Sequence, residues 1–174
     1  VYESLYNHAI TGTLVIADNR TLIGNLPIQG TERLSFRLAT KLESYSHESS
    51  IDFTEATGNP MHVYKLTNKE QPNDTTQTYT LHFCSREFLR NMRTKVSKSY
   101  NGRMDEAVNS IFKDPEFLDS KKKLFFQKTR NQDKVVIPNM TPIDAIKMLG
   151  KRSLPSNLTD SGGAGYLFYE TTKG

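Results

Sequence analysis

The sequence has a single cysteine, Cys84, so no internal disulfide can form. Its place at the end of an alternating apolar segment predicts a buried, inert thiol. A chain with one cysteine fits a reducing compartment, or particles assembled in one. No apolar run approaches the roughly 20 residues that a membrane-spanning helix needs. The opening VYESLYNHAITG lacks the basic and apolar regions of a signal peptide. We therefore expect no membrane partner.

A strong excess of one charge is also missing, since 23 basic residues face 19 acidic ones and the net charge is +4. With 174 residues, 36% apolar and 24% charged, the chain can form one ordinary domain or two small ones. Two basic clusters remain, and we interpret each as a solvated face, because nucleic-acid surfaces interleave basic and exposed aromatic residues. They are Arg86, Arg90, Arg93, Lys95 and Lys98, and the run Lys121, Lys122 and Lys123.

Motifs for nucleotide binding and hydrolysis are absent. The stretch SGGAG matches neither glycine pattern for phosphate binding and precedes an expected strand instead of joining a strand to a helix. Asp160 in DSG has no second D-[ST]-G to share a proton with, as an aspartic protease requires. No G-x-S-x-G occurs. The acidic pairs Asp52 with Glu55, and Asp105 with Glu106, are explained by solvation or by a helix dipole.

The histidines lack metal-binding spacing. His62 and His82 can lie on neighbouring strands, where we expect a strand contact or an exposed imidazole. The four histidines are His8, His47, His62 and His82. Four N-x-[ST] sequons are attributed to chance in an Asn- and Thr-rich chain: Asn19, Asn73, Asn139 and Asn157. We therefore predict no enzyme, and no catalytic, cofactor-binding or metal residues.

The first part of the chain predicts antiparallel strands with a two-residue period. In ERLSFRLAT, Leu34, Phe36 and Leu38 share one face, and in TQTYTLHFC the shared face holds Tyr79, Leu81 and Phe83. AITGTLVIAD and HVYKLT repeat the pattern. NKEQPNDT is predicted to be a hairpin loop, because proline interrupts a continuous strand. Four or more such strands favour a small barrel or sandwich.

From Ser85 the apolar spacing changes to that of a helix, with Phe88, Leu89, Met92 and Val96 on one face up to a stop at Gly102. RMDEAVNSIFKDP predicts a second helix closed by Asp114-Pro115. KKLFFQKT, KVVIPN and GYLFYE predict strands.

A third helix is predicted after Thr141, with Thr141 as N-cap, Pro142 at the first position and Asp144 completing the capping pair. Ile143, Ile146 and Leu149 form its buried side. A long loop follows from Ser153 to Gly165, and TTKG resembles a hairpin turn without its returning strand. We expect the chain to end inside a structural unit. The fold class is α+β, with a mainly antiparallel β-barrel-like domain over residues 1–98 and part of a second α+β domain over 99–174.

The order of these segments resembles the baseplate hub protein of contractile-tailed bacteriophages. The opening carries the family's acidic-Ser-Leu-Tyr segment, a Gly-containing strand and an Asp-Asn turn. MHVYKL with TYTLHFCSREFLRN, then YNGRMDEAVNSIF, and IPNMTPIDAIKMLGKRS with GGAGYLFYETTKG are similar to its later segments. The opening residues that match are Tyr2, Glu3, Ser4, Leu5, Tyr6, Gly12, Asp18 and Asn19.

This resemblance implies two related tube domains per subunit, and three subunits in a pseudo-sixfold ring that joins the sixfold tail tube to the threefold spike. Related rings lie at the base of type VI secretion spikes. The resemblance further implies a non-enzymatic virion protein, assembled in the host cytoplasm, with tube and spike proteins as partners. Hub proteins are longer than this chain, so the trimer is an expectation for the full-length protein only. The alternative is an OB-like module that binds single-stranded nucleic acid through Arg86, Arg90 and Arg93.

Overall fold

The computed structural model describes residues 1–20, 22–25, 28–39, 50–130, 132–156 and 165–172. The chain divides into two compact units. The first comprises Val1–Glu3, Ala9–Arg86 and Thr171–Lys173, and the second mainly Ser4–His8 and Glu87–Glu170. Every named strand pair is antiparallel, and helices are present in both units. The prediction of an α+β protein built mainly from antiparallel strands is confirmed.

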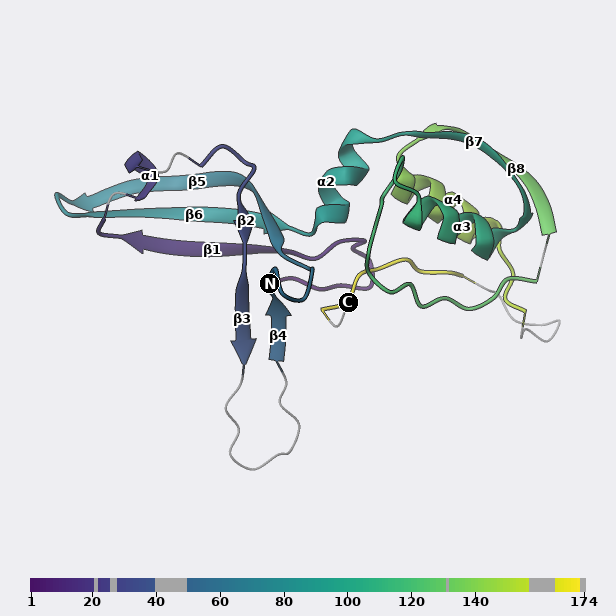
Figure 1. Ribbon diagram of the computed structural model, residues 1–174, viewed down its shortest axis with the longest axis horizontal. Coiled ribbons are helices and arrows are strands. Elements are labelled where there is room, and N and C mark those ends of the chain that lie inside the picture. Colours follow the sequence, from purple (N-terminus) through teal and green to yellow (C-terminus); the bar gives the residue numbers. More distant parts are fainter. Residues whose placement is uncertain (21, 26–27, 40–49, 131, 157–164, 173–174) are drawn as a thin grey trace, which may run out of the picture. The chain divides into compact units, whose positions relative to one another are not determined.

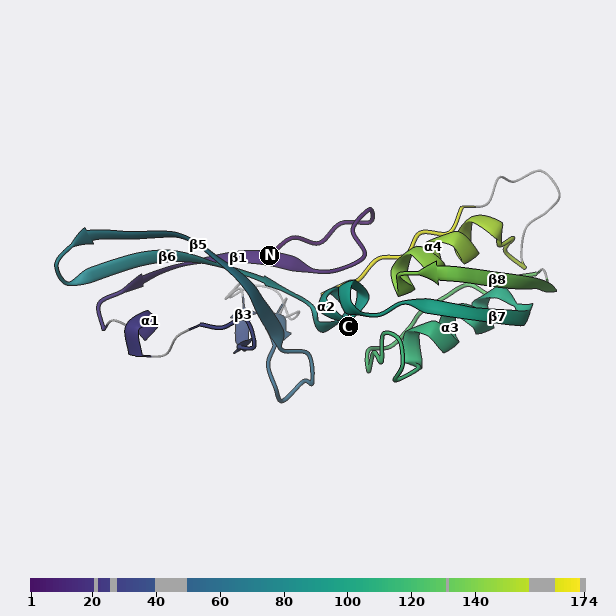
Figure 2. The ribbon, with the colours of Figure 1, turned by 90° about the horizontal axis from the view of Figure 1, so that it is seen from above.

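The first unit contains a twisted four-stranded antiparallel sheet (Figures 1 and 2). Its strand order is β1-β6-β5-β2. A separate pair, β3-β4, and the short helix α1 complete the unit. The bounds are β1 Thr11–Asp18, α1 Leu22–Asn25, β2 Arg33–Leu34, β3 Phe36–Ala39, β4 Ser50–Phe53, β5 Met61–Asn73 and β6 Thr76–Cys84.

The predicted apolar face of β6 is confirmed, because Tyr79, Leu81 and Phe83 are all buried. Cys84 is also fully buried, as its position predicted. Tyr79 and Leu81 pack with Val63 of β5, whereas Phe83 packs with Ile10, Phe53 and Met61. One strand therefore supplies side chains to both apolar clusters of this unit.

The hairpin predicted at NKEQPNDT is confirmed, but its loop is only Asp74-Thr75, because β5 continues through Pro72 to Asn73. Its pairing with β6 shifts register between Thr67 and Glu70 and again between Glu70 and Asn73. On its other side β5 pairs only at Met61 and His62, so this stretch is an edge among the described residues. Edges and bulges are the two places where a strand tolerates proline.

The single strand predicted over ERLSFRLAT is two strands. β2 pairs with β5, and after Ser35 the chain leaves that sheet as β3 to pair with β4. The strand β4 was missed by the sequence pattern. Phe36 and Phe53 face each other across this pair with ring centroids 5.3 Å apart. The aromatic contact explains why a four-residue segment with little apolar periodicity forms a strand.

Gly12 leaves room for the Phe83 ring on the facing strand, since a Cβ atom at residue 12 would lie 2.7 Å from Cε2 of Phe83. The ring cannot move aside easily, because it is buried and packs edge-on against Phe36. We expect Gly12→Ala to lower the free energy of unfolding by about 1–3 kcal/mol through overpacking, measured by urea denaturation. Thr13→Ala on the exposed face is the control, and Phe83→Leu should restore part of the loss. Equal stability of Gly12→Ala and wild type would contradict the close contact.

The second unit packs two helices against one β-ribbon. The strands β7 and β8 pair along their length, and α3 and α4 lie on the same side of them (Figures 1 and 2). Fully buried Val96, Ile137 and Leu149 come from β7, β8 and α4. The bounds are α2 Arg86–Arg93, β7 Val96–Arg103, α3 Met104–Lys113, β8 Gln132–Met140 and α4 Pro142–Arg152. No helix of the described residues is long and apolar enough to cross a membrane.

The predicted start of α4 is confirmed in detail. The Thr141 hydroxyl accepts a hydrogen bond from the Asp144 backbone N–H at 3.3 Å and donates to the Asp144 carboxylate at 2.6 Å. Pro142 occupies the first turn, and Ile143, Ile146 and Leu149 are buried. The helix α3 and its end at Asp114 are confirmed as well. Side-chain capping fixes the start of α4, whereas α3 ends at Asp114 because the residue before Pro115 is kept out of the helical conformation.

The helix predicted from Ser85 to Gly102 is wrong beyond Arg93. Val96 begins β7 and is fully buried, whereas Met92 is exposed although it was assigned to the buried face. The side chain that α2 buries is Glu87. Ser, Asn, Tyr and Gly over residues 97–102 are weak helix formers. Pairing with β8 therefore overrides the apolar spacing.

Two further predicted strands are not strands in the structure. KKLFFQKT runs from Lys122 to Thr129 with only an isolated bridge, at Thr129. GYLFYE runs from Gly165 to Glu170 in a conformation that alternates side chains but joins no sheet. Both segments have the composition of a strand, but no described segment pairs with either of them along its length.

The boundary between the two units lies before Glu87, whereas the sequence pattern predicted a domain boundary after Lys98. The difference arises because α2 and the start of β7 contact the second unit. Arg90 donates hydrogen bonds to the backbone carbonyl groups of Pro115 and Phe117. The Asn91 side chain accepts one from the Ile143 backbone N–H.

Candidate functional site

The histidines singled out in the sequence serve packing and hydrogen bonding. His82 lies on β6 and its Nε2 atom is 2.8 Å from the Thr67 hydroxyl, while His62 is on the adjacent strand opposite Cys84. His8 stacks on Phe88 with centroids 6.0 Å apart, and burial together with Lys147 lowers its pKa. Over the described part of the chain, no group of three His, Cys, Asp or Glu residues is placed to hold a metal ion. His47, Asp160, Asn157 and the stretch SGGAG up to residue 164 lie outside the described residues.

The prediction that each basic cluster is a solvated face is wrong for part of each cluster. Arg90 is engaged with the carbonyl groups of residues 115 and 117, so it is not a solvated side chain. In the lysine run, Lys121 and Lys123 are exposed, but the side chain of Lys122 is only 12% exposed. The middle lysine of that run is therefore part of the interior.

Lys122 is the centre of a buried ionic cluster. Its ammonium group lies 2.9 Å from the Glu87 carboxylate and also contacts the carboxylate of Glu170. The Ser120 hydroxyl donates to Glu87 at 2.6 Å. Burial alone would raise the pKa of Glu87, but the charge of Lys122 and the bond from Ser120 outweigh it and lower that pKa. The cluster ties α2, the 120–122 segment and the 165–170 segment together.

Asp105 forms a second buried polar group at the start of α3. Its carboxylate accepts hydrogen bonds from the Arg103 guanidinium and from the Thr129 hydroxyl, the latter at 2.6 Å. Burial alone would raise the pKa of Asp105, and these hydrogen bonds lower it overall. Solvation is therefore wrong for Asp105, which is buried, although its place in the first turn of α3 agrees with the helix dipole, and exposed Glu106 fits both.

Acidification should destabilise the second unit through these two carboxylates. Because the folded-state pKa values of Asp105 and Glu87 are lowered, their contribution is complete above the ordinary values and is lost as pH falls through the lowered ones. We expect the urea midpoint to fall between about pH 5 and pH 3. The urea midpoint of Asp105→Asn should fall less than that of wild type over this pH range. The midpoint of Glu106→Gln should fall as much as that of wild type. Parallel falls for wild type and Asp105→Asn would contradict the assignment.

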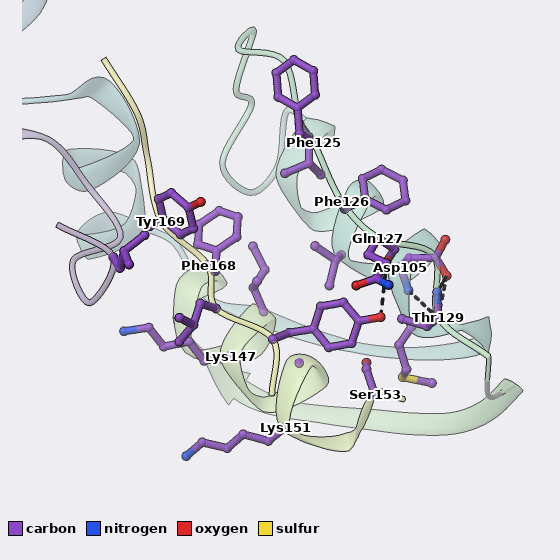
Figure 3. A pocket seen from close by; sticks show the side chains of 18 of the residues that line it. Asp105, Phe125, Phe126, Gln127, Thr129, Lys147, Lys151, Ser153, Phe168 and Tyr169 are labelled. Carbon is purple, nitrogen blue, oxygen red and sulfur yellow. Dashed lines mark hydrogen bonds between the residues drawn. The ribbon is translucent and has the colours of Figure 1, made fainter. Parts of the chain in front are cut away.

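A cleft of about 430 Å³ lies in the second unit beside these polar groups (Figure 3). Its walls are α3, α4, and the two extended segments 124–127 and 166–169. Leu5 and Tyr6 of the N-terminal segment also line it. Large apolar side chains are unusually exposed here: Phe125 is 82%, Phe126 46%, Leu167 61% and Tyr169 42% exposed.

Three polar side chains inside the cleft, those of Asp105, Ser153 and Tyr166, are hydrogen-bonded within the fold. Asp105 is bound by Arg103 and Thr129, and the Ser153 hydroxyl donates to the Leu149 carbonyl group at 2.7 Å. The Tyr166 hydroxyl lies 3.3 Å from the Lys128 carbonyl oxygen. Lys147 and Lys151 extend from α4 as exposed cations (Figure 3). This arrangement suits binding by apolar contact and charge, because no activated nucleophile or general base lies among these side chains.

Sequence reasoning missed this cleft because both of its aromatic walls were predicted to be strands of a sheet. A strand alternates its faces, so one side of FF and of YLFY should have been buried in that sheet. The available signal was the adjacent pair Phe125-Phe126 between lysines, where at least one ring has to face away from a core.

Comparison with known proteins adds no relative: no family model, curated protein or solved structure matches this chain.

Proposed function

We propose that this protein is a structural component of the baseplate hub of a contractile-tailed phage, joining a sixfold tail tube to a threefold spike. The observation that carries the proposal is the four-stranded antiparallel sheet of the first unit, in the part of the chain where the resemblance to hub proteins begins. A tube is built from such sheets lying side by side, and edge strands such as β1 offer main-chain groups for that contact.

The buried charges support an architectural role. Glu87, Lys122 and Asp105 are each neutralised by partners inside the fold. Such groups hold segments together, and none of these three side chains is free for proton transfer. On this proposal the protein acts in the virion by shape, as a trimer in its full-length form, with tube and spike proteins as partners and without a cofactor.

Gene context and particle shape test the proposal. Reading frames for tube, spike or wedge proteins are expected beside this one. The full-length protein, examined by electron microscopy, is expected to form rings of three subunits with pseudo-sixfold symmetry. A saturable small-molecule reaction that is abolished by replacing one polar residue, or a gene neighbourhood of unrelated metabolic enzymes, would reject it.

Single-stranded nucleic-acid binding is the second candidate, and one observation favours it. Exposed Phe125 and Phe126 lie beside the exposed lysines 121, 123 and 128, which is the interleaving that base stacking requires. The site would then be on the second unit and not on an OB-like barrel at Arg86, Arg90 and Arg93. A salt titration with an oligothymidylate of about 20 nucleotides decides it, since counterion release makes such affinity fall steeply with salt.

A further inference from the structure

We propose that the cleft of the second unit binds an extended segment of another protein, with large apolar and acidic side chains alternating, and that residues 165–169 pair with it as a β-strand. The inference rests on the proposed function, because it names a surface by which an assembly protein meets its partner. The first evidence for it is the main-chain hydrogen-bonding groups of residues 165–169. No hydrogen bond joins the backbone of residues 165–169 to any other described residue.

The 165–169 segment already has the form of a strand. Tyr166 and Phe168 are half-buried against the unit, whereas Leu167 and Tyr169 between them are exposed. The Phe168 ring packs edge-on against Phe112 of α3 at 6.2 Å, and Glu170 is held by Lys122. With the Tyr166 hydroxyl donating to the Lys128 carbonyl group, the inner face of the segment is held at Tyr166, Phe168 and Glu170, and its pairing groups need no rearrangement to meet a partner.

Five residues in this conformation extend over about 17 Å, so a partner strand of five or six residues would cover them. Main-chain pairing of this kind supplies affinity, and pockets for alternate side chains supply specificity. The cleft provides such pockets, since Val108, Leu124 and Ile146 line its base. Asp105, Ser153 and Tyr166 are hydrogen-bonded within the fold, whereas the backbone of 165–169 bonds to no other described residue and is available for pairing.

The exposed positive charges at the cleft indicate which side chains the partner segment carries. Lys147 and Lys151 stand one helical turn apart at the wall formed by α4, and both are exposed. The acidic side chain that lines the cleft, Asp105, is buried and bound to Arg103. A segment with carboxylates between its apolar residues complements this wall, whereas a basic segment is repelled. Stacked bases would use the exposed Phe125 ring but not the apolar base of the cleft (Figure 3).

The test uses two fluorescein-labelled peptides of about eight residues, in which leucine and valine alternate with glutamate in one and with lysine in the other. We expect the glutamate peptide to bind the full chain saturably and at least tenfold more tightly than the lysine peptide. The double variant Lys147→Glu with Lys151→Glu should reverse that preference. Hydrogen exchange should show the amides of 166–169 protected by the glutamate peptide. Lys121→Glu with Lys123→Glu, a reversal of two equally exposed lysines outside the cleft, is the matched control.

Equal binding of the two peptides, an unreversed preference in the double variant, or binding without protection of 166–169 would overturn the inference. So would displacement of the glutamate peptide by oligothymidylate, which would assign the cleft to nucleic acid, or concentration-dependent dimers abolished by the double variant, which would assign it to a second copy. Rings of the full-length protein that form without peptide binding would reject this surface and leave the hub proposal intact.

Discussion

Replacing Lys122 with methionine is expected to lower the free energy of unfolding by about 3–5 kcal/mol, because the change leaves the Glu87 and Glu170 carboxylates buried without their cation. Methionine keeps the length and apolar stem of lysine, so the loss reports the charge. Urea denaturation at pH 7 measures it. Replacing an exposed lysine of such a basic run should change the free energy of unfolding much less.

Lys123→Met is the matched control, since Lys123 is the exposed neighbour of Lys122, and its effect should stay within about 0.5 kcal/mol. In the Lys122→Met chain, burial without a counter-charge raises the carboxylate pKa values above those of the unfolded chain. The deficit should therefore shrink as pH falls from 7 to 5, while wild type shows no such gain. A Lys122→Met chain as stable as Lys123→Met would refute the buried cluster.

Truncating Leu149 to alanine should cost about 2–5 kcal/mol, because its side chain is fully buried in the core between α3, α4 and β8. The removed atoms leave a cavity that helices anchored by capping and by the β-ribbon cannot close. Leu154→Ala is the control for the same chemical change at a side chain that is 53% exposed. Thermal and urea unfolding of both variants give the comparison. If the two substitutions have similar effects, the core of the second unit is not packed around Leu149.

Parts of the candidate site followed from sequence and parts did not. The helices α3 and α4 that form two walls of the cleft were predicted, because their apolar stripes and caps are local patterns. The two segments that form the aromatic walls were predicted to be strands paired within a sheet. In the structure they run without a pairing strand among the described residues. Whether a strand-like segment joins a sheet depends on a distant partner strand, and no property of KKLFFQKT or GYLFYE encodes that partner.

The ionic cluster gives the same lesson for charge. Three consecutive lysines are indistinguishable by composition, yet Lys122 is buried while Lys121 and Lys123 are exposed. The difference is set by Glu87 and Glu170, which lie 35 and 48 residues away in the chain. A solvated face was the reasonable interpretation of the run, and it was wrong at one residue because the counter-charges come from two other segments.

The sequence by itself determined the antiparallel α+β class, the buried face of β6 and the caps of α4, because each depends on residues within a few positions of one another. Tertiary structure alone decided that β5 continues through Pro72, that Val96 begins a strand, and that residues 165–169 remain without a pairing strand in the described chain. In those three places the free energy depends on which distant segment supplies the hydrogen bonds and the buried area, and no local pattern records that choice.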